Sequence, residues 1–188
     1  MELSSTAKVI LGMLAGRPRT GYEIKALADH STRFFWTASY GQIYPELRRL
    51  AEAGLIEGTS SPQGGRQRTV YQLTRAGRHE LKRWHELPPE IFEYRDEGLL
   101  KLFFSDAVAP ERAAEIARQL SERSTEIGDE LREVEAQAEG VNQGGYTVLR
   151  FGIAFNDFIA EWFERQALAF EEGTPLTKDD PVPARELT

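Results

Sequence analysis

Residues 39–56, SYGQIYPELRRLAEAGLI, contain the segment that decides the fold. Ser39 and Gln42 have the Ser-x-x-Gln spacing of a capping box, which predicts that a helix begins here. Gly54 fits the C-terminal end of that helix. Its apolar face, at helical spacing, consists of Ile43, Leu47, Leu50 and Ala51. The opposite face is expected to point towards solvent, and it carries Gln42, Tyr44, Arg48 and Arg49.

The flanking segments predict further helices and a hairpin. In chain order we expect a helix over 5–15, a helix over 20–30, the helix that begins at Ser39, strands over 55–60 and 69–74, and a helix that begins after Thr74 and ends before residue 87. Thr20 and Glu23 form a second capping box, of the Thr-x-x-Glu type. The turn between the strands, residues 61–68, is glycine-rich and basic.

Three compact helices followed by a basic two-stranded hairpin are typical of a winged helix-turn-helix, whose third helix enters the major groove of DNA. Its first turns would meet bases or phosphates, and arginines of the helix and the wing would hold the backbone. The candidate contacts are Tyr22, Ser39, Tyr40, Gln42, Tyr44, Arg48, Arg49, Arg66, Gln67 and Arg68. A simpler interpretation stays open for Arg48 and Arg49, which would suit any solvated helix face.

The charge distribution differs between the two halves of this 188-residue chain. Residues 1–88 hold 13 Lys and Arg against 8 Asp and Glu, a net charge of +5. Residues 89–188 hold 10 against 22, a net charge of −12. A basic first half fits a polyanionic partner, although a chance excess on solvated faces would give the same totals.

The second half predicts two long antiparallel helices. One begins at Pro110 and carries a heptad seam of apolar and small residues: Ala113, Ala117, Leu120, Ser124, Ile127, Leu131, Val134 and Ala138. After a break at 140–145, the last helix repeats this alternating spacing of four and three residues from Leu149 to Phe170. A second apolar row lies beside it. A helix that is apolar on two sides needs two partners, and the simplest second partner is another copy of the chain.

The candidate dimerisation residues are Leu149, Ile153, Asn156, Trp162 and Phe163. Asn156 interrupts the seam, where an Asn can fix the register of an interface. Two alternatives stay open: Asn156 faces solvent or caps a neighbouring turn, and the second half forms a crowded monomeric bundle.

Several classes of protein are excluded by the sequence. The absence of cysteine rules out disulfides, thiolate zinc sites and cysteine nucleophiles. His79 and His85 point to different sides of one helix, and no catalytic or nucleotide-binding motif is present, so we expect no enzyme, metal or cofactor. The longest uncharged stretch, 34–45, is shorter than the ~20 residues of a membrane-spanning helix. We expect a cytoplasmic protein.

Five short motifs carry a family resemblance: ILGML at 10–14, GYEI at 21–24, GQIYPELRRL at 41–50, GLI at 54–56, and YQLT at 71–74 followed by Gly77. Pro45 inside the third helix is the most specific of these features, because it removes a helical hydrogen bond. The motifs resemble the PadR family of bacterial winged-helix transcriptional regulators. Residues 99–104 and 152–162 look like the virulence-activator type of PadR C-terminal domain, so the likeness covers about residues 5–172.

The resemblance implies a repressor that is released by a small aromatic or drug-like effector. A homodimer would place two recognition helices about 34 Å apart, so we expect it to bind double-stranded DNA at a pseudo-palindromic operator. Candidate residues for an effector pocket are Trp36, Phe103, Phe104 and Phe155, with ordinary packing as the alternative role of these aromatic side chains. The alternative function is a winged-helix protein–protein adaptor without DNA binding.

The expected fold class is mainly α, with two folded parts and a tail. Residues 1–88 form an N-terminal winged helix-turn-helix with a two-stranded wing, and residues 89–172 form an antiparallel helical dimerisation domain. Residues 173–188 are expected to be disordered, because glycine, proline and charged residues dominate this segment.

Overall fold

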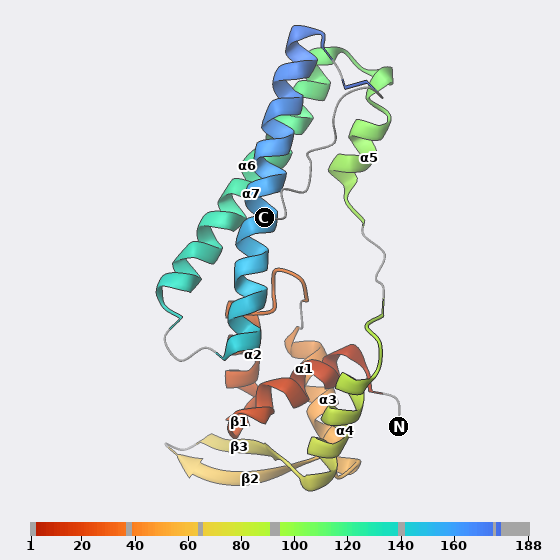
Figure 1. The fold of residues 1–188 in the computed structure, drawn as a ribbon. Helices are drawn as coiled ribbons and strands as arrows, with labels where there is room; N and C mark the ends of the chain where they lie inside the picture. Colours follow the sequence, from red (N-terminus) through yellow and green to blue (C-terminus); the bar gives the residue numbers. More distant parts are fainter. Residues whose placement is uncertain are drawn as a thin grey trace. The chain divides into compact units, whose positions relative to one another are not determined.

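The computed structural model describes residues 3–36, 39–63, 66–90, 95–138, 142–174 and 176–177, with the backbone alone at 61–63, 66 and 67. The chain divides into two compact units, Met1–Ile91 and Phe92–Thr188 (Figure 1). The glycine pair at 64–65 lies outside the described residues. So do residues 175 and 178–188, which are most of the tail expected to be disordered.

The first unit is a winged helix. Its described elements are α1 Ser5–Ala15, β1 Arg19–Thr20, α2 Gly21–His30, α3 Tyr40–Glu52, β2 Ile56–Gln63, β3 Arg66–Leu73 and α4 Arg75–Glu86 (Figure 1). The strands form an antiparallel sheet in the order β1-β3-β2. The predicted fold class is confirmed, although β2 and β3 extend further towards the turn than expected. The sequence pattern did not predict β1, because two residues carry no detectable periodicity.

Side-chain caps begin α2 and α3 where the sequence pattern places them. Thr20 Oγ1 accepts a hydrogen bond from the Glu23 backbone N–H at 3.2 Å, and the Glu23 carboxylate accepts one from the Thr20 backbone N–H at 2.8 Å. The bonds from Thr20, first the backbone one, hold the pKa of Glu23 below its ordinary value. Gln42 Oε1 likewise accepts from the Ser39 backbone N–H at 2.9 Å.

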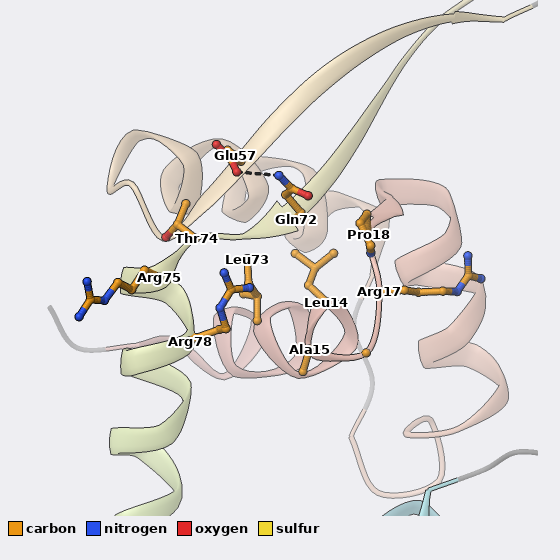
Figure 2. Close-up of a pocket in the computed structure, with 11 residues that line it drawn as sticks. Leu14, Ala15, Arg17, Pro18, Glu57, Gln72, Leu73, Thr74, Arg75 and Arg78 are labelled. Carbon is orange, nitrogen blue, oxygen red and sulfur yellow. Dashed lines mark hydrogen bonds between the residues drawn. The ribbon is translucent and has the colours of Figure 1, made fainter.

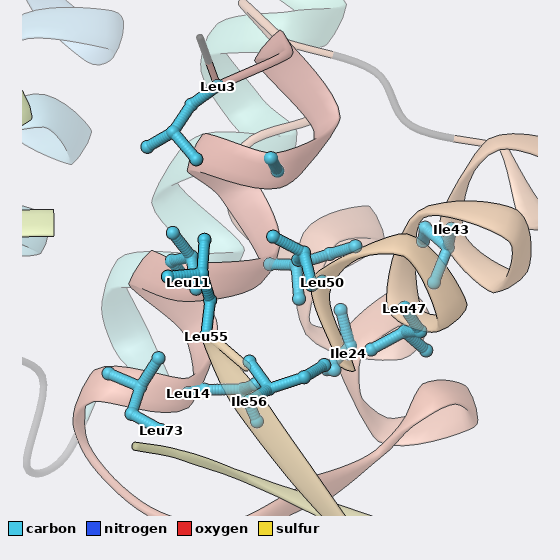
Figure 3. Close-up of a cluster of buried hydrophobic side chains, with 12 residues drawn as sticks. Leu3, Leu11, Leu14, Ile24, Ile43, Leu47, Leu50, Leu55, Ile56 and Leu73 are labelled. Carbon is cyan, nitrogen blue, oxygen red and sulfur yellow. The ribbon is translucent and has the colours of Figure 1, made fainter. Parts of the chain in front are cut away.

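One apolar core holds the first unit together (Figure 3). Ile43, Leu47 and Leu50 of α3 have no exposed surface, as their helical spacing predicts. They pack in a cluster with Ile10, Leu11, Leu14, Ile24, Leu55, Ile56 and Leu73. Full burial of a Leu or Ile side chain stabilises a fold by about 1.5–3 kcal/mol. Because this face of α3 is buried, its opposite face is turned to solvent.

The start of α4 is seated on the backbone of Leu55. Thr74 Oγ1 caps α4 by accepting from the Gly77 N–H at 3.0 Å, and the Thr74 backbone N–H donates to the Leu55 carbonyl at 3.1 Å. A Cβ on Gly77 would fall 2.0 Å from the Leu55 carbonyl oxygen. Glycine is therefore required where α4 crosses the first residues after α3.

A polar network ties the start of α1 to α3. Ser4 Oγ caps α1 by accepting from the Ala7 N–H and donates to Glu46 Oε1 at 2.6 Å. Arg49 donates to both carboxylate oxygens of Glu46, from Nε at 2.9 Å and from Nη2 at 2.6 Å. These bonds, chiefly that from Arg49, hold the pKa of Glu46 below its ordinary value even though partial burial opposes the shift.

The second unit contains an antiparallel pair of long helices. Its described elements are α5 Glu97–Phe103, a 3-10 turn Ser105–Ala107, α6 Pro110–Ala136 and α7 Gln143–Glu172. Helices α6 and α7 run side by side (Figure 1). Pro110 occupies the first turn of α6, and Gly173 ends α7 in a left-handed conformation with φ 67°.

The predicted seam residues Ala113, Ala117, Ser124 and Leu131 of α6 are buried, and the buried face is offset by one residue from the prediction at two positions. Ser121 and Gly128 are buried, whereas the neighbouring Leu120 and Ile127 are only half-buried. Ser121 Oγ donates to the Ala160 carbonyl of α7 at 2.8 Å. Small residues such as Ser121 and Gly128 let the two backbones approach closely. Leu120 still packs on the cluster of Ala117, Phe163 and Ala167, so the correction to the predicted seam is that Ser121 and Gly128 are the more deeply buried residues.

We expect Gly77→Ala to lower the free energy of unfolding by about 3 kcal/mol, because the new methyl group overlaps the Leu55 carbonyl. Gly12→Ala is the matched control: a Cβ there meets nothing within 4 Å, and alanine favours a helix over glycine by up to about 1 kcal/mol. Urea unfolding followed by circular dichroism measures both. A Gly77→Ala protein as stable as the wild type would contradict the close contact.

We expect Glu46→Gln to destabilise the protein by about 1 kcal/mol at neutral pH, because it removes charge-assisted bonds from a largely buried carboxylate to a partly exposed arginine. Since the folded state lowers the pKa of Glu46, this contribution is complete above the unfolded pKa and is lost as the pH falls through the folded pKa. Urea unfolding from pH 7 downwards tests this. The difference from wild type should shrink in acid, whereas Glu52→Gln, an exposed change on the same helix, should show little difference throughout.

Candidate nucleic-acid interface

The solvent face of α3 carries stacked aromatic rings beside a lysine. The rings of Tyr40 and Tyr44 have centroids 6.2 Å apart and planes inclined by 16°, and both side chains are exposed. The Lys25 ammonium of α2 lies 5.2 Å from the centroid of the Tyr40 ring and pairs with Asp29. Lys25 was not among the sequence candidates. Its spacing of three residues from Tyr22, on the same helix face, is the signal that could have identified it.

Helix α2 begins in direct contact with this face of α3. A Cβ on Gly21 would lie 2.9 Å from Tyr44 Cε1, so the backbone of α2 approaches the tyrosine ring as closely as glycine allows. The next side chain, Tyr22, is 65% exposed. The start of α2 and the outer face of α3 therefore form one continuous surface that contains Tyr22 and Tyr44.

Ser39 and Gln42 stand at the start of α3 and bond to each other. Gln42 Oε1 accepts from the Ser39 backbone N–H at 2.9 Å and from Ser39 Oγ at 3.1 Å. The Gln42 amide nitrogen makes no hydrogen bond to any described residue. Both side chains are exposed, so Gln42 presents donors to an outside acceptor while its oxygen holds the helix start.

The arginine pair of α3 divides into two roles. Arg49 is held by the Glu46 carboxylate, a contact that also raises the Arg49 pKa. Arg48 is exposed and makes no ion pair or side-chain hydrogen bond within the part of the chain that the structure describes. Arg48 is therefore available to an outside anion, whereas Arg49 helps to fix α3 against the start of α1.

The wing carries a second exposed arginine. Arg68 lies on β3 opposite Ser61 of β2, and its side chain is exposed without an ion pair to any described residue. Arg66 and Gln67 continue β3 towards the turn, opposite Gln63 and Pro62 of β2, and their side chains lie outside the described residues.

The candidate dimerisation residues lie mainly in the contact between α7 and α6 of the same chain. Ile153 and Phe163 are each only 7% exposed in the single chain. Leu149 and Trp162 are half-buried, and Trp162 packs on the cluster that contains Phe163. Asn156 Nδ2 donates to the Gly152 carbonyl of its own helix at 2.8 Å. The seam from Leu149 therefore packs within one chain, and a role of these residues in dimerisation stays a prediction.

The second apolar row of α7 remains uncovered by the described part of the chain. Val148, Phe151, Phe155 and Phe158 are between 42% and 66% exposed. The rings of Phe151 and Phe155 stack with centroids 5.8 Å apart, and Phe158 stacks on Trp162 at 6.1 Å. We call these four residues the outer row of α7.

The candidate pocket residues do not form one group. Trp36 is half-buried in the first unit, whereas Phe103, Phe104 and Phe155 are exposed in the second. Phe103 and Phe104 meet edge to face, with centroids 5.0 Å apart. Phe104 also lines an apolar cavity of about 450 Å³ between the α5 region and α6, together with Leu100, Lys101, Val108, Arg112 and Ile116.

Neither a metal cluster nor a membrane span occurs within the described residues. No three His, Asp or Glu side chains there are grouped so that they could hold a metal ion. No described helix combines the length and the apolar character needed to cross a membrane.

Two family models match the chain, one in each half. The model of the transcriptional regulator PadR-like family matches residues 10–83, and the virulence activator alpha C-term model matches residues 94–170. The negative transcriptional regulator PadR of Bacillus subtilis is 33% identical over 125 residues, which are 64% of this chain and 68% of that protein.

Solved structures share the fold. B. subtilis PadR in complex with operator DNA has a TM-score of 0.79 and 25% identity, covering 87% of this chain and 97% of that one. B. subtilis PadR in complex with p-coumaric acid has a TM-score of 0.75 and 24% identity, covering 88% and 96%. The sequence match to B. subtilis PadR and the family model at residues 10–83 agree, and the chain belongs to the PadR-like family of transcriptional regulators.

Proposed function

We propose that this chain is a sequence-specific, DNA-binding transcriptional repressor. The observation that carries the proposal is the solvent face of α3. It presents Tyr40, Tyr44 and Arg48, which has no ion pair with any described residue, on a helix whose other face is buried in the core. Such a helix can enter a major groove without disturbing its own fold. B. subtilis PadR, which shares this fold, has been solved with operator DNA.

Each exposed side chain has a role that fits its chemistry. Arg48 on α3 and Arg68 on the wing would contact phosphates, which position the protein without reading sequence. The free amide nitrogen of Gln42 would donate to a base edge at the start of the helix. Tyr22 and Tyr44 would pack against the sugar-phosphate backbone beside these contacts.

We propose that the chain works as a homodimer through the outer row of α7. Exposed apolar rows of this size usually mark an interface, and the seam beside this row is already occupied by α6. Two copies related by a twofold axis would present two α3 helices to successive major-groove faces of a pseudo-palindromic operator, about 34 Å apart.

We also propose a small aromatic or drug-like effector that releases the repressor in the cytoplasm, with no catalytic activity. B. subtilis PadR has been solved with p-coumaric acid. The apolar cavity beside Phe104 would accept a flat apolar body. Lys101 and Arg112 line it as well, paired with Glu97 and Glu115.

We expect the double variant Arg48→Gln/Arg68→Gln to bind all duplexes more weakly, with the salt slope of log K shallower by about two units, because each arginine neutralises about one phosphate. Fluorescence anisotropy with an operator selected from genomic fragments, from 50 to 300 mM salt, measures this. Lys82→Gln/Arg83→Gln removes the same charge from exposed sites on α4 and is the matched control.

Variants of the two arginines of α3 should behave differently. Arg48→Gln should weaken binding with little change in melting temperature, whereas Arg49→Gln should lower the melting temperature because it releases Glu46. Equal salt slopes for wild type, the double variant and its control would refute the assignment of Arg48 and Arg68. A wild-type protein with no preferred duplex and a flat salt response would instead identify a protein–protein adaptor.

We expect Phe151→Ala to weaken the dimer without unfolding the chain, because Phe151 is 66% exposed in the single chain. Phe163→Ala is the comparison: it removes a ring that is only 7% exposed and should cost about 3–5 kcal/mol of folding free energy. Sedimentation equilibrium and thermal unfolding, run on both variants, distinguish the two effects. A wild-type protein that sediments as a monomer at low micromolar concentration would overturn the dimer.

A further inference from the structure

The aromatic pair on α3 rests on two consecutive turns of α2. Gly21 and Lys25 are four residues apart and share one face of α2, as Tyr40 and Tyr44 share one face of α3. The Tyr44 ring lies against the backbone of Gly21, where a Cβ would be 2.9 Å from Tyr44 Cε1. The Tyr40 ring lies against Lys25, with its centroid 5.2 Å from the ammonium nitrogen. Helix α2 therefore supports each ring of the pair at a separate point.

Lys25 is itself held in place beside Tyr40. Its ammonium donates to both carboxylate oxygens of Asp29, one turn further along α2, and only 14% of its side chain is exposed. The face of an aromatic ring attracts a cation, and the attraction is stronger where water is excluded. The pair with Asp29 thus fixes the ammonium, and the fixed ammonium in turn holds the Tyr40 ring.

Lys25 differs from the basic side chains that extend into solvent. Figure 2 shows Arg17 and Arg75 pointing outward in opposite directions from a hollow at the end of α1, as charges surrounded by water do. The charge of Lys25 is instead compensated by Asp29, and its aliphatic stem is covered. A lysine in this state is poorly suited to a direct contact with a DNA phosphate, since it would have to leave a partner that it already has.

Tyr40 is the ring that needs this support. It is the first residue of α3, and its hydroxyl makes no hydrogen bond to any described residue. Its ring stacks on Tyr44 at 6.2 Å between centroids, and the neighbouring Lys25 limits its rotation. The first residues of a recognition helix are the ones that contact base edges. A ring that turned freely would have to be ordered on binding, and this would reduce the affinity for DNA.

We propose that Lys25 is a positioning residue for DNA recognition: it holds the Tyr40 ring in the orientation that contacts a base, and it does not itself bind the DNA. This inference rests on the DNA-binding function proposed above and adds a residue to the contacts assigned there. Because Lys25 acts through a ring, its loss lowers the preference for the operator without changing the number of phosphates contacted. A phosphate contact behaves differently: its loss weakens all duplexes alike and makes the salt slope shallower by about one unit.

The first measurement follows the rings without DNA, by NMR of full-length protein carrying ¹³C in its tyrosine rings. Lys25→Met should shift the ring resonances of Tyr40 and Tyr44, because the cation and the support that it gives to the stack are both lost. Lys25→Arg should keep them near their wild-type positions, since a guanidinium can lie over the same ring. Lys82→Met is the matched control, because Lys82 also pairs with a carboxylate four residues later, Glu86 of α4. It should leave both resonances in place.

The second measurement compares the operator duplex with an unrelated duplex of equal length, over the same range of salt as before. Lys25→Met should lower the affinity for the operator about fivefold, while the affinity for the unrelated duplex stays within about twofold and the salt slope within about 0.3 units of wild type. Lys25→Arg should restore most of the operator affinity, and Lys82→Met should match the wild type. Melting temperatures of all variants check that the fold is retained.

A lower operator preference with an unchanged salt slope and shifted ring resonances, restored by arginine, supports the inference. Operator binding by Lys25→Met that equals that of the Lys82→Met control overturns it and leaves DNA binding standing. A salt slope shallower by about one unit, a loss of operator affinity with unmoved ring resonances, or no recovery in Lys25→Arg also overturns it. A wild-type protein without a preferred duplex would overturn the proposed function, and this inference with it.

Discussion

The structure of the first unit depends on the complete burial of one face of α3. Ile43, Leu47 and Leu50 have no exposed surface, and their i, i+4, i+7 spacing fixes the rotation of the helix about its own axis. That rotation turns Tyr44 and Arg48 to solvent. The contact between Ser4 and Glu46 ties α3 to the start of α1 as well. A surface that recognises another molecule must be presented rigidly, and here the hydrophobic core supplies that rigidity.

Helix starts and core positions could be predicted from the sequence because local rules determine them. The Thr20 box needs only two residues three apart, and the apolar face of α3 needs only its own periodicity. The two-residue strand β1 could not be predicted, since pairing with Tyr71 and Val70 defines it. Glu46 and Arg49 are three residues apart on one helix, so the sequence allows an ion pair between them. The sequence alone does not say which of the adjacent Arg48 and Arg49 binds the Glu46 carboxylate.

The second unit shows where hydrophobic periodicity stops being informative. Ser121 and Gly128 lie in the α6–α7 contact because small side chains allow close approach, and the hydroxyl of Ser121 finds the Ala160 carbonyl as its partner. The predicted heptad seam places that contact one residue earlier, at Leu120 and Ile127. The same pattern could not say which of two apolar rows on α7 faces its own chain. Burial of Ile153 and Phe163 within the chain answers this, and it leaves the outer row for another partner.

The partners of the arginines indicate their roles more clearly than their positions in the sequence do. Arg49, Arg83 and Arg132 each meet a carboxylate that can account for their presence. Arg48, Arg68, Arg75 and Arg78 have no such carboxylate among the described residues. The second half of the chain holds most of the acidic residues, so the first half keeps a net positive charge, part of which lies at the exposed Arg48 of α3 and Arg68 of the wing. An exposed face with an excess of positive charge attracts a polyanion, which fits the DNA contacts proposed for Arg48 and Arg68.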